Sequence, residues 1–230
     1  MLLALYIVAS LLLALGICLA SGRSRPWLVQ TAYAATVVGS LLTAAKIVPL
    51  MDGVFVSVAV GLYSASFLLT DYIGEVYGKD QAFRAVWMGI VAELIVLVAV
   101  LFAVAVPAAP FFEGQEAFAT VFGTAPRILI ASISAFVVAQ LLDVTVFHAI
   151  RRATGERWLF LRNNASTVIG QTADTLVFYT VAFLGVPGIS LPALIITTLA
   201  VKIVVALLDT PALYAALWIT RNRAPIPQAV

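Results

Sequence analysis

Charged and chemically reactive residues are scarce in this chain. Its 230 residues include one cysteine and one histidine, and only 10% of them are charged. The single Cys18 excludes a disulfide framework and a cysteine metal site. The sequence has no H-E-x-x-H, G-x-S-x-G or Walker motif, which argues against a metalloprotease, a serine hydrolase and an ATPase. We therefore expect no enzyme activity, no metal ion and no cofactor.

Apolar residues, by contrast, make up 63% of the chain, far above the roughly 45–50% of a soluble domain. Runs of about 20 apolar residues are long enough to cross the hydrocarbon core of a bilayer. The sequence predicts seven such spans, at 2–20, 27–50, 54–73, 85–106, 127–149, 164–186 and 192–219. The fold class that follows is an all-α polytopic membrane helix bundle. No positive residue precedes the first run, so we expect a retained anchor rather than a signal peptide.

The distribution of Lys and Arg among the loops predicts the orientation of the bundle. If the N-terminus is outside, nearly all loop cations fall on the cytoplasmic side, as the positive-inside rule requires. These residues are Arg23, Arg25, Lys79, Arg84, Arg151, Arg152, Arg157, Arg162, Arg221 and Arg223. The opposite loops hold Asp52, Glu113 and Glu116, with Arg127 at a helix edge. We therefore predict that the N-terminus is outside and the C-terminus is cytoplasmic.

Several charged residues nevertheless lie inside the predicted spans. They are Lys46, Glu93, Asp143, Asp174, Lys202 and Asp209. At about 2.5–3.5 kcal/mol each, unpaired charges of this number would cost on the order of 15–20 kcal/mol, more than the net stability of a typical fold. These groups must therefore be paired, neutralised or hydrated. For Lys46, a position near the interface, where the side chain reaches out of the hydrocarbon, is an equally good interpretation.

The spacing of the polar residues places them on single helix faces. Residues three and four apart share a face, so Asn163, Gln171, Asp174 and Phe178 form one stripe. Because lipid offers no polar partners, we expect this stripe and four others to line a shared polar cavity. The segments 140–147 and 171–178 share the pattern Q-x-x-D-x-x-V-F, which is typical of the internal repeats of transporters. Pro211 predicts a kink in the last helix beside Asp209.

Four separated blocks resemble the signature sequences of a known family. They are L-L-T-D-Y-I-G-E-V-Y-G-K (68–79), Q-L-L-D-V-T-V-F-H (140–148), R-N-N-A-S-T-V-I-G-Q-T-A-D-T-L-V-F (162–178) and K-I-V-V-A-L-L-D-T-P-A-L-Y (202–214). The family is the YhhQ or VUT family of queuosine-precursor transporters. The resemblance implies a bacterial inner-membrane importer of 7-cyano-7-deazaguanine and 7-aminomethyl-7-deazaguanine, used to salvage precursors for tRNA modification. Because members often have six helices, residues 1–26 read as an added helix and loop, and 27–230 as the six-helix core.

The chemistry of a deazaguanine base matches these polar stripes. The base presents an N–H beside an amino group, an edge that a carboxylate accepts in bidentate fashion. An amide can donate to its carbonyl, and an aromatic ring can stack on its plane. The predicted substrate-binding residues are Gln140, Asp143, Asn163, Gln171, Asp174, Phe178 and Tyr63. We assign charge balance or ion coupling to Lys46, Glu93, Lys202 and Asp209.

Other classes of membrane protein fit the sequence less well. Lys202 in a seventh helix is typical of a microbial rhodopsin, but Thr198 stands where an aspartate is expected and no tryptophans form a retinal pocket. An aspartyl protease would require Gly-rich contexts around its aspartates. The closest alternative is the substrate-binding membrane subunit of an ATP-driven energy-coupling-factor importer of vitamins or nucleobases. We favour a secondary, proton-coupled carrier, because carboxylates at mid-depth are what such coupling requires.

The expected partners follow from this interpretation. They are a small deazapurine substrate and the lipid bilayer, and formation of a homodimer is left open. The net charge of +2, without a run of basic residues, gives no sign of nucleic acid binding.

Overall fold

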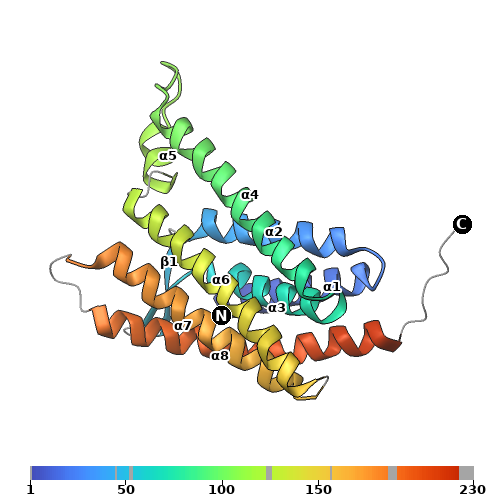
Figure 1. The fold of residues 1–230 in the computed structure, drawn as a ribbon. Helices are drawn as coiled ribbons and strands as arrows, with labels where there is room; N and C mark the ends of the chain where they lie inside the picture. The colour runs from blue at the N-terminus through green and yellow to red at the C-terminus, as the bar shows by residue number, and fades with distance from the viewer. Residues whose placement is uncertain are drawn as a thin grey trace, which may run out of the picture.

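A computed structural model describes residues 2–44, 46–51, 54–122, 126–155, 157–185 and 191–222 (Figure 1). These residues form eight helices and one two-stranded sheet. The elements are α1 (Leu2–Ser21), α2 (Pro26–Thr43), β1 (Ile47–Met51), β2 (Val54–Ser57), α3 (Val60–Val76), α4 (Lys79–Ala105), α5 (Gln115–Phe122), α6 (Pro126–Thr154), α7 (Leu159–Phe183) and α8 (Leu191–Asn222). The protein is therefore helical, as predicted.

Four helical segments are both long and apolar enough to cross a membrane. They are Leu2–Ser21, Lys79–Ala105, Ile130–Thr154 and Ile195–Asn222. The other three predicted spans correspond to α2, α3 and α7, which have 17 to 25 residues and carry more polar side chains. A multi-pass membrane protein follows from these segments, whereas the count of seven spans stays a prediction.

The prediction of helix throughout 27–50 and 54–73 was wrong at the end of the first segment and at the start of the second. There the chain forms an antiparallel hairpin in which Ile47 lies opposite Ser57 and Val48 opposite Val56. The β-branched residues of this segment favour strands, and Pro49 has no backbone N–H for a helical hydrogen bond. Lys46 therefore lies between α2 and the hairpin, where its side chain is exposed, and not inside a span.

The helix α3 occupies the centre of the bundle. It packs against α1, α2, α4, α6 and α8, and nearly all of its residues are buried. The most extensive helix contact is between α6 and α7, which pack along much of their length, and α8 lies beside α7 (Figure 1). Large apolar side chains point outward instead, among them Trp87, Ile95, Phe102 and Trp218. Such an apolar outer surface is suited to contact with lipid tails.

The helix ends that carry Lys and Arg gather at one end of the bundle. The Ser21 hydroxyl, at the end of α1, lies 2.7 Å from the hydroxyl of Tyr77, just beyond α3. Tyr72 Oη near the end of α3 lies 3.0 Å from Thr220 Oγ1 near the end of α8. Arg151 near the end of α6 donates to the carbonyl of Gly74 at 2.7 Å. These contacts bring the predicted cytoplasmic loops together, although Arg223 lies outside the described residues. The predicted orientation itself stays a prediction.

The proline expected to kink the last helix lies inside α8, which continues through Pro211 to Asn222. The missing N–H of Pro211 leaves the carbonyl of Leu207 without its helical hydrogen bond. The interruption falls beside the buried Asp209.

A glycine permits the close approach of α6 and α7. A Cβ atom at Gly170 would lie 3.2 Å from both the carbonyl oxygen of Ala139 and the Cβ of Asp143. We predict that Gly170→Leu lowers the thermal stability of the detergent-purified protein, with a cost of about 1–3 kcal/mol or more, because overpacking forces the helices apart. Gly16→Leu is the matched control, since no atom lies within 4 Å of its added Cβ. Equal melting temperatures for the two variants would contradict this packing.

Candidate functional site

A cavity of about 470 Å³ lies among the helices α2 to α8 and the hairpin. Its volume falls within the range of small-molecule sites, roughly 300–1,000 Å³. Most of its lining is apolar. The polar lining residues include Ser40, Ser57, Tyr63, Glu93, Ser132, Asp174, Tyr179, Thr198 and Lys202. The cavity therefore has the composition expected of a small-molecule binding site.

Asp174 is the best-satisfied charge in the cavity wall. Lys202 Nζ forms an ion pair and a hydrogen bond with Asp174 Oδ2. The hydroxyl of Tyr63 donates to Asp174 Oδ1 at 2.7 Å. The Lys202 ammonium also lies 5.2 Å from the centroid of the Tyr63 ring, within the range of a cation–π interaction. These contacts identify the lysine that neutralises Asp174, which the sequence left open.

Aromatic side chains of α7 form a second part of the wall. The ring of Tyr179 stacks on that of Phe183 with a centroid separation of 5.7 Å. The Phe178 ring meets the edge of Tyr179 at 5.2 Å. The hydroxyl of Tyr179 lies 2.8 Å from Thr198 Oγ1 on α8 and forms a hydrogen bond with it. This bond holds α7 and α8 together beside the Asp174–Lys202 pair.

Glu93 differs from Asp174 in having no ion-pair partner within the described residues. It lines the cavity from α4 and is only 3% exposed. Its Oε2 atom is buried without a hydrogen bond, and no cation lies within ion-pair distance of it among the described residues. The sequence marked Glu93 as a charge inside a span but could not show that it shares a cavity with Asp174.

Four of the predicted substrate-binding residues lie outside the lining of this cavity. Gln140, Asp143, Asn163 and Gln171 are all buried between helices. Gln140 Nε2 donates to Ser66 Oγ at 3.4 Å. The Oε1 atoms of both glutamines have no hydrogen-bond partner within the part of the chain that the structure describes, and Asp143 lies beside the hydroxyls of Ser166 and Thr167. The three remaining predicted residues, Tyr63, Asp174 and Phe178, do line the cavity.

Of the residues predicted to balance charge or couple ions, some line the cavity and others do not. Glu93 and Lys202 line the cavity, whereas Asp209 is buried on α8 away from the lining. The exposed Lys46 lies outside the lining as well. Asn163 Nδ2 donates to Thr210 Oγ1 at 3.3 Å, so the polar stripe of α7 continues toward Asp209 on α8.

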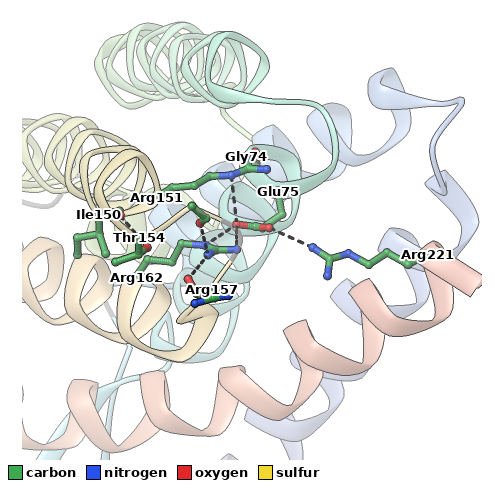
Figure 2. A network of polar contacts seen from close by, with 9 residues as sticks. Gly74, Glu75, Ile150, Arg151, Thr154, Arg157, Arg162 and Arg221 are labelled. Atoms are coloured by element: carbon green, nitrogen blue, oxygen red, sulfur yellow. Dashed lines mark hydrogen bonds and ion pairs between the residues drawn. The ribbon is translucent and has the colours of Figure 1, made fainter.

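A second polar centre, which sequence reasoning missed, lies where the basic helix ends meet. Arg162 Nε donates to Glu75 Oε1 at 2.6 Å, and Arg162 Nη2 lies 2.5 Å from the same oxygen (Figure 2). Both side chains are fully buried. Arg162 Nη1 donates to the carbonyl oxygens of Gly155 at 3.3 Å and of Arg157 at 3.0 Å. The guanidinium therefore fixes the α6–α7 loop as well as the end of α3.

Two more arginines approach the same carboxylate from other helices. Arg221 Nη2 of α8 lies 3.6 Å from Glu75 Oε2, and Arg151 Nε of α6 lies 3.9 Å from Glu75 Oε1 (Figure 2). The prediction placed Arg162 only among the loop cations of the cytoplasmic side. The only available signal was that Glu75 and Arg162 each belong to a signature block. Glu75 is the shared acceptor that ties the ends of α3, α6, α7 and α8 together.

Comparison with known proteins identifies the family. The model of the putative vitamin uptake transporter family matches residues 57–216. This chain belongs to that family. The match contains Tyr63, Glu93, Asp174 and Lys202 of the cavity, and it confirms the resemblance found in the four sequence blocks.

Three similar proteins carry a related functional name. A probable queuosine precursor transporter of Bacillus subtilis (strain 168) is 40% identical over 159 residues, which are 67% of this chain and 69% of that protein. A probable queuosine precursor transporter of Haemophilus influenzae is 34% identical over 119 residues, 51% of this chain and 47% of the relative. The queuosine precursor transporter of Escherichia coli (strain K12) is 32% identical over 119 residues, 51% and 50% of the two chains. These names fit the expectation of a non-enzyme. No solved structure matches.

The Glu75 centre makes a testable prediction about stability. Glu75→Gln leaves the buried Arg162 guanidinium without its counter-charge, which costs about 3–5 kcal/mol in comparable sites. We expect a large drop in the melting temperature of the purified protein. Arg157→Gln is the control, because Arg157 is exposed and contributes only its backbone carbonyl. If both variants melt like the wild-type protein, the Arg162–Glu75 pair does not hold the helix ends together.

Proposed function

We propose that the protein imports the queuosine precursors 7-cyano-7-deazaguanine and 7-aminomethyl-7-deazaguanine across the bacterial inner membrane as a secondary carrier. The observation that carries this proposal is the carboxylate of Asp174, held by Tyr63 and Lys202 in the wall of an otherwise apolar cavity. The names of the relatives support the substrate class.

The cavity offers the groups that a deazaguanine ring requires. The adjacent N–H and amino groups of the base are two donors, and a carboxylate has about four lone-pair sites to accept them. Asp174 therefore accepts from the base while keeping its bonds to Tyr63 and Lys202. The aromatic side chains of Phe178 and Tyr179 supply flat apolar surface for the ring.

The two polar centres lie far apart along one helix. Twelve residues of α3 separate Tyr63 at the cavity from Glu75, a distance of about 18 Å at the rise of an α-helix. In the proposed carrier the Glu75 centre closes the cytoplasmic end while the cavity is occupied from the other side. The gathering of Arg and Lys at that end supports this orientation, with the C-terminus in the cytoplasm.

Asp143 is the group we propose for proton coupling. It is completely buried and has no ion-pair partner among the described residues, and its polar neighbours are the hydroxyls of Ser166 and Thr167, so a charge on it is costly in the bundle interior. Asp174 is less suited to this role, because Lys202 neutralises it already. Binding and release of a proton at Asp143 would then alternate with movement of the substrate.

Loss of the cavity carboxylate should abolish transport. We predict that Asp174→Asn lowers uptake of 7-cyano-7-deazaguanine by about 100-fold or more, since charge-assisted bonds to the base are lost. The assay uses cells that neither make nor import queuosine precursors, and it measures queuosine in their tRNA. Asp80→Asn, at an exposed position in the first turn of α4, is the control. Normal uptake by Asp174→Asn, present in the membrane at wild-type amounts, would remove this residue from the site.

Coupling is tested separately in proteoliposomes. An imposed pH gradient should drive accumulation of the labelled base by the wild-type protein. Asp143→Asn should still exchange internal for external substrate but should no longer accumulate it, because the variant has no carboxyl to carry the proton. Gradient-driven accumulation that is unchanged in Asp143→Asn would refute coupling through this group. A requirement for an ATPase partner would refute secondary transport altogether.

A further inference from the structure

The charges around the cavity do not balance. Asp174 is bonded to Lys202 and to Tyr63. The positive charge of Lys202 is therefore already paired with the Asp174 carboxylate. Glu93 lines the same cavity and has none within the described residues. Lys46 cannot serve, because it is exposed beside the hairpin and does not line the cavity.

The groups that face Glu93 do not supply the missing positive charge. Asp174, Tyr63 and Tyr33 interact electrostatically with it and none of them is a cation, while Lys202, the cation of the cavity lining, is bonded to Asp174. The hydroxyl of Tyr33 is buried without a hydrogen bond and therefore does not donate to Glu93. A carboxylate in such surroundings is stabilised most by a positively charged hydrogen-bond donor. Among the described residues, no side chain provides one.

The geometry points to Glu93 as the residue that binds a protonated amine of the substrate. This inference rests on the proposed function and names the substrate that the same cavity prefers. Of the two proposed substrates, 7-aminomethyl-7-deazaguanine carries an ammonium group, whereas the nitrile of 7-cyano-7-deazaguanine has no N–H to donate. Asp174 on α7 and Glu93 on α4 then hold different ends of one ligand, the base edge and the aminomethyl group.

Asp174 and Glu93 bind different groups of the ligand because only Asp174 is paired with a cation of the protein. Asp174 with its own lysine is a neutral pair, so it accepts uncharged N–H donors without attracting a cation. Glu93 has no internal cation, so a substrate cation is the partner that completes it. A substrate without an ammonium group forms no ion pair with Glu93, so Glu93 adds nothing to its binding affinity. The cavity should therefore bind the aminomethyl base more tightly than the cyano base.

Competing uptake of the two bases tests this assignment. In cells that lack their own synthesis and import of these compounds, Glu93→Gln should raise the KM for 7-aminomethyl-7-deazaguanine by about 10- to 100-fold, the loss expected for a hydrogen bond between charged groups. The KM for 7-cyano-7-deazaguanine should change by less than about 3-fold, because the nitrile makes no bond to Glu93. Glu116→Gln, which removes an exposed carboxylate of α5, should affect neither compound. Equal effects of Glu93→Gln on both bases would overturn the assignment.

A binding measurement separates failure of this inference from failure of the proposed function. Benzylamine and benzonitrile are simple aromatic probes that differ in the same way as the two substrates. Benzylamine should raise the melting temperature of the purified wild-type protein but not that of Glu93→Gln, and benzonitrile should have no effect that depends on Glu93. If the wild-type protein transports neither deazaguanine yet shows this difference, the proposed function is wrong and the amine site stands. If benzylamine stabilises both proteins equally, or neither, Glu93 does not bind amines.

Discussion

The buried ion pair between Arg162 and Glu75 determines how the helix ends of this bundle are arranged. A guanidinium has five N–H donors, and lipid supplies no acceptor for any of them. Arg162 therefore takes the Glu75 carboxylate from α3 and two carbonyl oxygens from the loop before α7. Arg221 adds α8 to the same carboxylate. With Arg151 of α6 also within ion-pair distance, four helix ends converge on one acidic group.

The position of α3 transmits this constraint to the cavity. The same helix carries Glu75 at one end and Tyr63, which donates to Asp174, near the other. A rigid displacement of α3 would therefore move both Glu75 and the hydroxyl of Tyr63. The dense packing of α3 on five other helices leaves little room for it to move alone. Any opening of the basic end would therefore alter the contacts of the cavity carboxylate.

Apolar patterning was enough to predict the helical fold, because about 20 consecutive apolar residues have few other stable structures. It failed between α2 and α3, where β-branched residues are as apolar as a helix but favour strands, so Lys46 was wrongly placed inside a span. Helical spacing also placed Asp174 and Phe178 on one face correctly, since both line the cavity. Spacing within a helix cannot give the distance to another helix. Neither the Lys202 partner of Asp174 nor the burial of Arg162 was therefore readable from the sequence.

The repeated pattern Q-x-x-D-x-x-V-F shows why position within the fold decides the chemistry of a motif. Asp174 lies on α7 opposite α8, and Lys202 of α8 neutralises it. Asp143 occupies the matching place on α6, where it lies against Gly170 of α7 and near the acid Asp71 of α3, and it has no ion pair in the described part of the chain. One aspartate is thereby a fixed charge pair at a cavity wall, and the other a buried carboxyl whose charge must be removed or supplied from outside. Two copies of one sequence pattern therefore have different charge environments, because the residues that face them differ.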